Sequence, residues 1–154
     1  MDPLSIRAAF FDLGDTLVVA SDRRWVAGAR EALTDLRGRG LRLGVISNTG
    51  NRSRAELAEL LPPDFDWGVF CGPLVLLSAE IGVAKPDPEI FRRAVAASGV
   101  TAPECLFCTE SLLDALVAQR VGMRAARVLP PPNADGGGLP AALVESGLIP
   151  APSA

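Results

Sequence analysis

Asp12 is the first side chain in this sequence whose type and surroundings suit a catalytic role. It follows an apolar run at residues 8–11 and precedes a polar turn that contains Gly14, Asp15 and Thr16. In open α/β sheets, ligands bind at the carboxyl ends of the strands, where this carboxylate would stand. A carboxylate can attack phosphorus and carry it as an aspartyl phosphate. Asp12 is therefore a candidate for that chemistry.

Further polar residues follow the ends of other apolar runs. They are Ser47 with Asn48, Lys85 just before a predicted helix, and Glu110 with Asp114. The carboxyl ends of parallel strands lie at one edge of a sheet, so we expect these side chains to meet the first carboxylate in one crevice.

The chemistry of this set suits phosphoryl transfer. A serine hydroxyl with adjacent N–H groups can hold phosphate oxygens, and a lysine can neutralise the charge that spreads onto them. Carboxylates across the crevice offer the oxygen ligands that Mg²⁺ prefers. Lys85 is the only lysine among 15 basic residues, a mild indication that a compact point charge is needed there. The chain has no histidine, which excludes Ser-His-Asp and Cys-His catalysis.

Composition limits the compartment and the partners. Cys105 and Cys108 form a C-x-x-C, but they lie in an apolar run typical of a strand, so we interpret them as core cysteines. The start of the chain lacks the layout of a signal peptide, and no apolar run is long enough to span a membrane. The net charge of −3 gives no reason to expect nucleic acid or a membrane as partner. We expect a cytoplasmic protein whose oligomeric state the sequence leaves open.

Apolar runs and amphipathic patterns alternate along the chain, which predicts an α/β fold, a doubly wound three-layer αβα sandwich with a mostly parallel sheet. Strands are expected at 7–13, 41–47, 105–108 and 124–129, with short apolar runs at 67–71 and 74–78. Helices are expected at 27–37, from the Ser53-x-x-Glu56 capping box to Pro62-Pro63, at 87–98 and at 111–121. Residues 1–129 form the predicted catalytic core, and 130–154 a Pro/Gly-rich tail with a candidate short helix at 139–146.

These motifs, in this order, resemble those of the haloacid dehalogenase superfamily from about residue 7 to 129, and the Lys-Pro-Asp-Pro-x-Ile-Phe stretch is quite specific to it. The resemblance implies a HAD-like, Rossmannoid fold and a Mg²⁺-dependent phosphatase. It implies that Asp12 is the nucleophile and a metal ligand, and that the carbonyl of Gly14 is another ligand. It further implies that Ser47 and Asn48 bind phosphate and that Lys85 steadies both the phosphate and the nucleophile. Its substrate would be a phosphorylated small molecule or a macromolecular phosphoester.

Two motifs depart from the family pattern. Gly14 replaces the aspartate that protonates the leaving alkoxide and activates water, and Asp15 could compensate only through a shifted turn. A general acid contributes about 10²–10⁴ in rate, so alkyl esters should react slowly and acyl or aryl phosphates should suffer less. In the fourth motif the implied metal ligands are Glu110, which stands where aspartate is usual, and Asp114. The pattern Ser111-x-x-Asp114 also suits a helix cap, so Asp114 keeps both roles.

Only short segments separate the motifs, whereas relatives with a cap domain insert a much longer segment, so we expect a capless protein with an open crevice or one roofed by another subunit. Two alternatives to the phosphatase stay open. One is a catalytically degenerate member that binds a phosphorylated ligand or partner. The other, less favoured, is a 2-haloacid dehalogenase, because such relatives enclose an apolar pocket under a cap.

Overall fold

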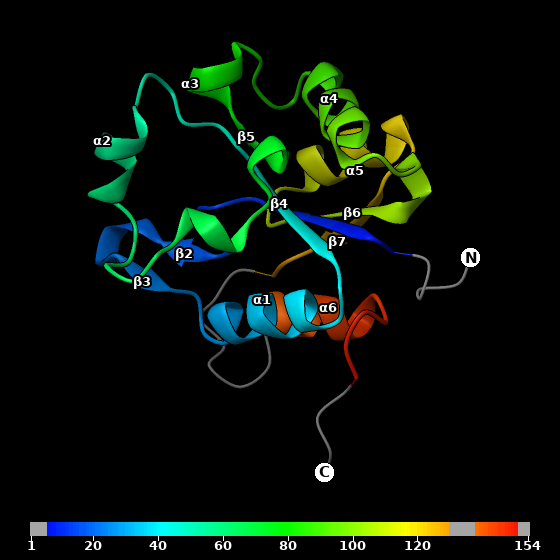
Figure 1. Ribbon diagram of the computed structural model, residues 1–154, viewed down its shortest axis with the longest axis horizontal. Helices are drawn as coiled ribbons and strands as arrows, with labels where there is room; N and C mark the ends of the chain where they lie inside the picture. The colour runs from blue at the N-terminus through cyan, green and yellow to red at the C-terminus, as the bar shows by residue number, and fades with distance from the viewer. Residues whose placement is uncertain (1–5, 130–137, 151–154) are drawn as a thin grey trace.

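The computed structural model describes residues 6–129 and 138–150, and a five-stranded parallel sheet forms its centre (Figure 1). The strand order is β5-β4-β1-β6-β7. The strands are β1 (Ala8–Phe11), β4 (Arg42–Ser47), β5 (Val75–Leu77), β6 (Cys105–Thr109) and β7 (Arg124–Arg127). The central strand β1 pairs with β4 on one side and β6 on the other, so the chain builds the sheet outwards in both directions. The predicted doubly wound architecture is confirmed.

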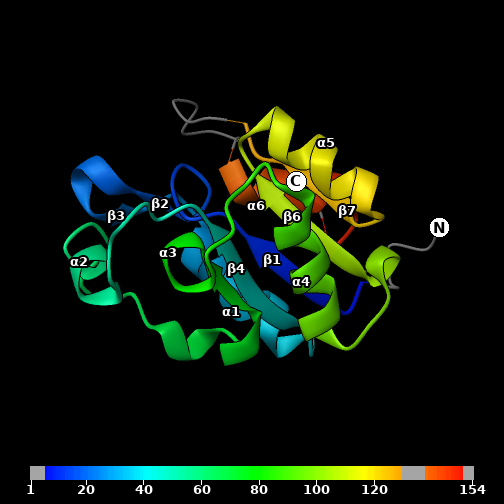
Figure 2. The same cartoon turned by 90° about the horizontal axis from the view of Figure 1, so that it is seen from above.

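Helices cover both faces of the sheet and give the three layers. One face carries α1 (Ala29–Gly38) and α6 (Gly138–Glu145), and the other carries α4 (Pro88–Ser98) and α5 (Leu112–Val121) (Figure 1). Two shorter helices, α2 (Arg54–Ala58) and α3 (Ser78–Ile81), lie with the hairpin of β2 (Val18–Val19) and β3 (Arg24–Trp25) at one end of the sheet (Figure 2). That end is the carboxyl end of β1 and β4, because each of these segments follows a strand directly or closely.

The side chains of β1 alternate between two hydrophobic cores. Ala9 and Phe11 pack on the side of α1 and α6, and Ala8 and Phe10 pack on the side of α4 and α5. All four are at most 1 % exposed. A parallel strand buried on both faces needs a continuous apolar run, which is why the sequence leading to Asp12 contains no polar residue after Arg7.

The helix ends follow the local signals in the sequence. Asp87 accepts a hydrogen bond from the N–H of Glu89 and so caps α4, which ends at a left-handed Gly99. Ser53 and Glu56 form both hydrogen bonds of the predicted capping box of α2. The apolar run at 67–71 contains a 3₁₀ turn, Trp67–Val69, and only the run at 74–78 gives a strand.

The helix beyond the predicted domain boundary belongs to the same core. Leu139 and Leu143 of α6 are fully buried in the cluster that contains Phe11 and Leu33. The boundary itself falls at residue 130, outside the described residues, so the division into core and tail stays a prediction. Cys105 and Cys108 are fully buried free thiols, as expected for core cysteines.

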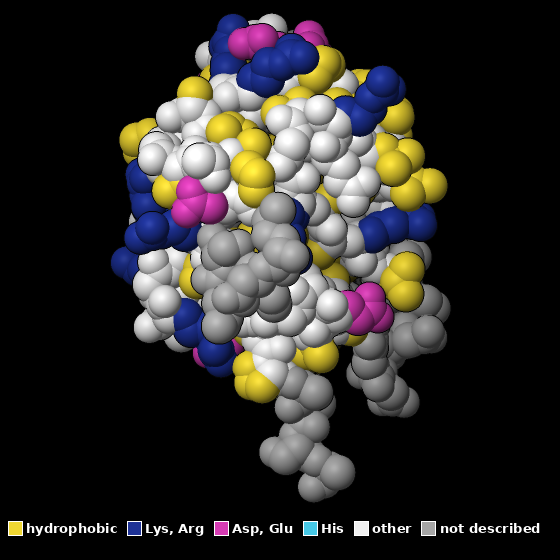
Figure 3. All heavy atoms as spheres, turned by 90° about the vertical axis from the view of Figure 1, so that its right-hand side faces the viewer, with side chains coloured by type: hydrophobic (Ala, Val, Ile, Leu, Met, Phe, Trp, Pro, Cys, Tyr) yellow, Lys and Arg dark blue, Asp and Glu magenta, His cyan; other side chains and the backbone are white. Residues whose placement is uncertain are grey.

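Within the described residues, the segment between β1 and β4 contains the β2–β3 hairpin and α1, and the segment between β4 and Lys85 contains α2, β5, α3 and short 3₁₀ turns. No helix in the described part of the chain is both long and apolar enough to cross a membrane. On the face shown in Figure 3, arginine side chains lie around the margins, separated by neutral and hydrophobic surface.

Candidate active site

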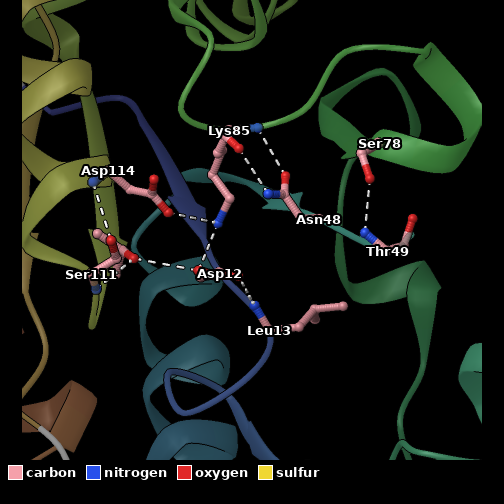
Figure 4. Close-up of polar contacts among 9 residues, drawn as sticks. Asp12, Leu13, Asn48, Thr49, Ser78, Lys85, Ser111 and Asp114 are labelled. Atoms are coloured by element: carbon pink, nitrogen blue, oxygen red, sulfur yellow. Dashed lines mark hydrogen bonds and ion pairs between the residues drawn. The ribbon is translucent and has the colours of Figure 1, made fainter.

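A buried ion pair joins the ends of two distant segments at the carboxyl edge of the sheet. Asp12 follows β1, the central strand, and Lys85 lies in the loop between α3 and α4. Lys85 Nζ is 2.6 Å from Asp12 Oδ2, and the two side chains are 3 % and 12 % exposed (Figure 4). A charge-assisted contact of this length fixes the orientation of the carboxylate. The structure therefore brings together the two residues predicted to carry the chemistry.

Two more hydrogen bonds orient the Asp12 carboxylate. Its Oδ1 accepts from the backbone N–H of Leu13 at 2.8 Å, and its Oδ2 accepts from Thr109 Oγ1 at 3.4 Å. Thr109 ends β6, which runs parallel to β1 with Phe11 opposite Cys108, so the next residues along both strands are neighbours. Thr109 was not among the predicted site residues. Pairing the two strand ends would have placed it beside the carboxylate.

Asp114 lies on the other side of the lysine. Its Oδ2 is 3.3 Å from Lys85 Nζ, and its side chain is 14 % exposed (Figure 4). The cap of α5 is the hydroxyl of Ser111, which accepts a hydrogen bond from the N–H of Asp114. The carboxylate of Asp114 is thus directed to the lysine while its main chain is capped. Lys85 bridges two carboxylates that follow different strands.

Asn48 holds the loop that carries Lys85. Its amide Nδ2 donates to the carbonyl of Lys85 at 2.9 Å, and its Oδ1 accepts from the N–H of Lys85 at 2.8 Å (Figure 4). Because both polar groups of the side chain are engaged, any contact of Asn48 with phosphate would come from its main chain. The neighbouring Ser47 is 5 % exposed, and its hydroxyl has no hydrogen-bond partner among the described residues. Their phosphate-binding roles stay predictions.

Thr49 and Ser78 form a second link, which the sequence analysis missed. The N–H of Thr49 donates to Ser78 Oγ at 2.8 Å, and the N–H of Ala79 donates to Thr49 Oγ1 at 3.1 Å. These bonds connect the end of β4 to the start of α3, the helix that precedes the lysine loop. Both residues end apolar runs, but their pairing depends on β4 and β5 being neighbours.

Negative charge exceeds positive charge in this crevice. Burial raises the pKa of the Glu110 carboxyl above its ordinary value, and the charges of Asp12 and Asp15 raise it further. Lys85 acts in the opposite direction, and Asp114 adds a smaller upward shift. Two carboxylates, Asp12 and Asp114, contact the ammonium group of Lys85 directly. Asp15 itself is exposed and has a left-handed backbone with φ 58°, so the turn directs it towards solvent.

The structure does not assemble the predicted metal ligands into one cluster. Among the described residues, no three His, Cys, Asp or Glu side chains are grouped so that they could hold a metal ion. The physical reason is that Lys85 lies between Asp12 and Asp114. The metal-binding roles of Asp12, Gly14, Glu110 and Asp114 stay a prediction.

The donor chemistry nevertheless fits Mg²⁺. This ion is commonly bound through one or two carboxylates with several waters, and it does not need an all-protein cage. The excess of negative charge that raises the Glu110 pKa is what a divalent cation would offset. Asp12 and Asp114, whose carboxylates both contact Lys85, offer oxygen donors of this kind.

The chain is an α/β protein with an open parallel sheet. Its carboxylate–lysine pair lies at the carboxyl end of the central strand, where such sheets place their ligands, which makes this the candidate site. The chain belongs to the family of haloacid dehalogenase-like hydrolases, whose model matches residues 18–122. The match covers the lysine loop and the fourth motif and begins after Asp12.

Curated relatives of the chain include phosphatases. It is 36 % identical over 101 residues to a phosphatase of Mycobacterium tuberculosis (strain CDC 1551 / Oshkosh), covering 63 % of this chain and 43 % of that protein. It is 38 % identical over 104 residues to a glyceraldehyde 3-phosphate phosphatase of Pyrococcus abyssi, covering 66 % and 41 %. The chain thus spans about two fifths of the length of these relatives.

Solved structures show the same fold. A HAD family enzyme of Bacteroides thetaiotaomicron, in complex with magnesium and inorganic phosphate, has a TM-score of 0.64 at 16 % identity, covering 84 % of this chain and 98 % of that chain. An uncharacterised protein of Corynebacterium glutamicum has a TM-score of 0.57 at 24 % identity, covering 79 % and 84 %. Because the sequence identities are only 24 % and 16 %, these two structures show that the chain shares their fold and nothing more specific.

Proposed function

We propose that this chain is a Mg²⁺-dependent phosphatase that acts through an aspartyl phosphate on Asp12. The observation that carries the proposal is the buried contact of 2.6 Å between Asp12 and Lys85 at the end of the central strand, in a chain of a hydrolase family. A nucleophilic carboxylate with a fixed cation beside it can attack phosphorus and stabilise the charge that develops on the phosphoryl oxygens.

The proposed reaction has two steps. Asp12 attacks the phosphorus atom, an aspartyl O–P bond forms, and the bond to the ester oxygen breaks with its electron pair leaving on that oxygen. Water then attacks the phosphorus of the acyl phosphate, which releases inorganic phosphate and restores Asp12. The unpartnered hydroxyl of Ser47 and the ammonium group of Lys85 bind phosphoryl oxygens. Thr109 and the Leu13 N–H hold the carboxylate in its orientation.

Mg²⁺ would neutralise phosphoryl and carboxylate charge when bound at Asp12, the carbonyl of Gly14 and Asp114. For Asp114 to serve, its contact of 3.3 Å with Lys85 must lengthen. Glu110 is a further acidic group whose pKa is raised by burial first and then by the charges of Asp12 and Asp15.

The leaving group receives no proton from residue 14. A Cβ built on Gly14 would meet no heavy atom within 4 Å, so the position is open. Asp15 is exposed, and we assign it no step. Esters whose leaving groups need little protonation, namely acyl and aryl phosphates, are therefore the proposed good substrates. Three relatives are named for their substrates, as a glyceraldehyde 3-phosphate phosphatase, a phosphoserine phosphatase and a sesquiterpene phosphatase. These names all refer to phosphorylated small molecules, and we extend only that class to this chain. We further propose a capless protein acting in the cytoplasm.

The test is turnover of acetyl phosphate and p-nitrophenyl phosphate with Mg²⁺. We expect Asp12→Asn to abolish turnover and Asp35→Asn to leave it unchanged, because Asp35 forms an exposed ion pair with Arg39 on α1. Equal rates in the parent chain and the Asp12→Asn variant would refute the proposal.

A second candidate function is binding of a phosphorylated ligand or partner without useful turnover. It is favoured by Gly14 and by the engagement of Asp114 with Lys85. If the parent chain is inert and the double substitution Gly14→Asp and Glu110→Asp gives rapid hydrolysis, the binding function is supported. Mg²⁺-dependent turnover by the unmodified chain contradicts it.

A further inference from the structure

A small apolar pocket adjoins the proposed active site. It lies between the β2–β3 hairpin and the α2 region, which are side by side in Figures 1 and 2, and has a volume of about 160 Å³. Its apolar lining consists of Leu13, Val18, Ala20, Leu57, Leu60 and Leu61. Such a cavity is close in size to an apolar cavity of about 150 Å³ that accepts benzene. The pocket therefore fits one six-membered ring or a short alkyl group.

The walls of this pocket are held in place. Leu57 and Leu61 are 6 % and 4 % exposed and belong to the hydrophobic core. Arg23, in the turn of the hairpin, donates to the carbonyls of Leu61 at 3.2 Å and Ala58 at 3.3 Å. These bonds connect the hairpin to the α2 region across the outer side of the pocket. The cavity is thus formed before a ligand arrives, which reduces the entropic cost of binding.

The inner end of the pocket reaches the catalytic turn. Gly14 and Ser47 both line it, and they follow the two adjacent strands β1 and β4. Gly14 has no side chain, and a Cβ there would meet no atom within 4 Å, so the space beside the turn that follows Asp12 is open. A group bonded to a phosphoryl centre at Asp12 can extend into this space.

A cation without a partner stands at the rim. Arg52 lines the pocket and is exposed, and within the described parts of the chain its guanidinium forms no hydrogen bond or ion pair. The other arginine nearby, Arg54, is engaged by Glu80 at 2.7 Å. Arginine binds carboxylates through paired hydrogen bonds, so a free guanidinium here suits an anionic group on the ligand.

We propose that the pocket binds the leaving group of the substrate, and that this group is a compact apolar ring, as in an aryl monophosphate, with a carboxylate at its far end towards Arg52. The proposal rests on the proposed function and names its substrate class. The chemistry agrees with the loss of the acid at position 14. When Asp12 forms its bond to phosphorus, the P–O bond to the ring breaks, and a phenolate leaves with the electron pair. The phenolate then takes its proton from water, so no protein acid is required.

The experiment compares three phosphates with Mg²⁺: 4-carboxyphenyl phosphate, phenyl phosphate and acetyl phosphate. In the parent chain we expect the lowest KM for the carboxylated ring. We expect Arg52→Gln to raise that KM roughly 3- to 10-fold, the range of a partly exposed charge-assisted hydrogen bond, and to change the KM of phenyl phosphate by less than about twofold. The matched control is Arg120→Gln, an exposed arginine near the end of α5 that lacks a partner among the described residues.

A second variant tests the pocket volume. Leu60 is only partly buried, so Leu60→Trp can be accommodated by the fold while its larger side chain fills the cavity. We expect it to raise the KM of phenyl phosphate about tenfold and to leave acetyl phosphate, which does not reach the pocket, unchanged. Leu116→Trp, at a residue 48 % exposed on α5, is the control for adding a tryptophan.

The outcomes separate the two proposals. Suppose first that the parent chain hydrolyses acetyl phosphate. Equal KM values for the two aryl phosphates would then overturn the pocket assignment and leave the catalytic proposal intact. Equal effects of Arg52→Gln and Arg120→Gln on these KM values would do the same. If the parent chain hydrolyses nothing, calorimetric binding of phenylphosphonate and 4-carboxyphenylphosphonate decides. Weaker binding of the carboxylated compound by Arg52→Gln than by the parent then supports the pocket assignment although the catalytic proposal has failed, and equal binding overturns it.

Discussion

Lys85 is the residue whose removal tests the geometry of the site most directly. Its ammonium group lies 2.6 Å from Asp12 and 3.3 Å from Asp114, and its side chain is 3 % exposed. In Lys85→Met an apolar stem of similar length replaces the charge, and two carboxylates then face each other without a cation. Removing one partner of a buried ion pair costs about 3–5 kcal/mol. The two aspartates are 12 % and 14 % exposed, so water reaches them in part and we expect the lower end, about 3 kcal/mol.

The assay is thermal and urea unfolding, each followed by circular dichroism, in a double-mutant cycle with Asp12→Asn. Since 1 kcal/mol corresponds to about 2–4 °C in Tm for a domain of this size, Lys85→Met should lower Tm by about 6–12 °C. The coupling energy between the two substitutions should be about 1–3 kcal/mol, because the asparagine removes one of the charges that the lysine neutralises.

The matched control is the same cycle on Arg39 and Asp35, an exposed pair at 3.1 Å on α1. Exposed pairs of this spacing contribute about 0.3–0.5 kcal/mol. A Lys85→Met variant within about 1 kcal/mol of the parent chain, or a cycle whose two substitutions are additive, would refute a buried and coupled ion pair.

Three further outcomes are expected. The side chain introduced by Gly14→Asp meets open space, so this variant should fold with a stability within about 1 kcal/mol of the parent chain. In a steady-state assay it should raise the turnover of alkyl phosphates, relative to acetyl phosphate, by up to about 10²–10⁴. If turnover does not rise, the missing acid is not by itself what limits the rate. Asn48→Ala removes both hydrogen bonds to the main chain of Lys85. We expect kcat to fall about tenfold or more and the free energy of unfolding to drop by about 1–2 kcal/mol. An unchanged kcat would contradict a positioning role for Asn48. Burial raises the pKa of the Cys105 and Cys108 thiols, which reduces their thiolate fraction. Thiol reagents should therefore label only the partly exposed Cys71 in the native protein. Mass spectrometry should find Cys105 and Cys108 modified only after unfolding.

The elements of the fold were largely predictable because their signals are local. Asp87 followed by proline, and Gly99 after the last helical residue, define both ends of α4. The alternation of apolar runs and amphipathic patterns gave the parallel sheet, since a buried parallel strand needs a continuous apolar run. The exception is the run at 67–71, where the chain forms a 3₁₀ turn, because hydrophobicity alone does not decide between a strand and a packed loop.

The contacts that orient the site were less predictable because they join distant parts of the chain. Thr109 and Asp12 are 97 residues apart and meet through the register of β1 with β6. Asn48 and Lys85 are 37 residues apart, and the sequence gives no local sign that an amide side chain will bind a particular loop. Such pairings depend on which strands become neighbours, a property of the whole sheet.

The sequence by itself determined which chemistry is available: one lysine, no histidine, a carboxylate after an apolar strand, and no acid at position 14. Only the tertiary structure decided how these groups are arranged. It placed Lys85 in contact with both Asp12 and Asp114, and it opened an apolar pocket beside Gly14. The physical reason is that the type of a side chain fixes what it can do, whereas its partners within 3–4 Å are fixed by strand order, register and loop closure.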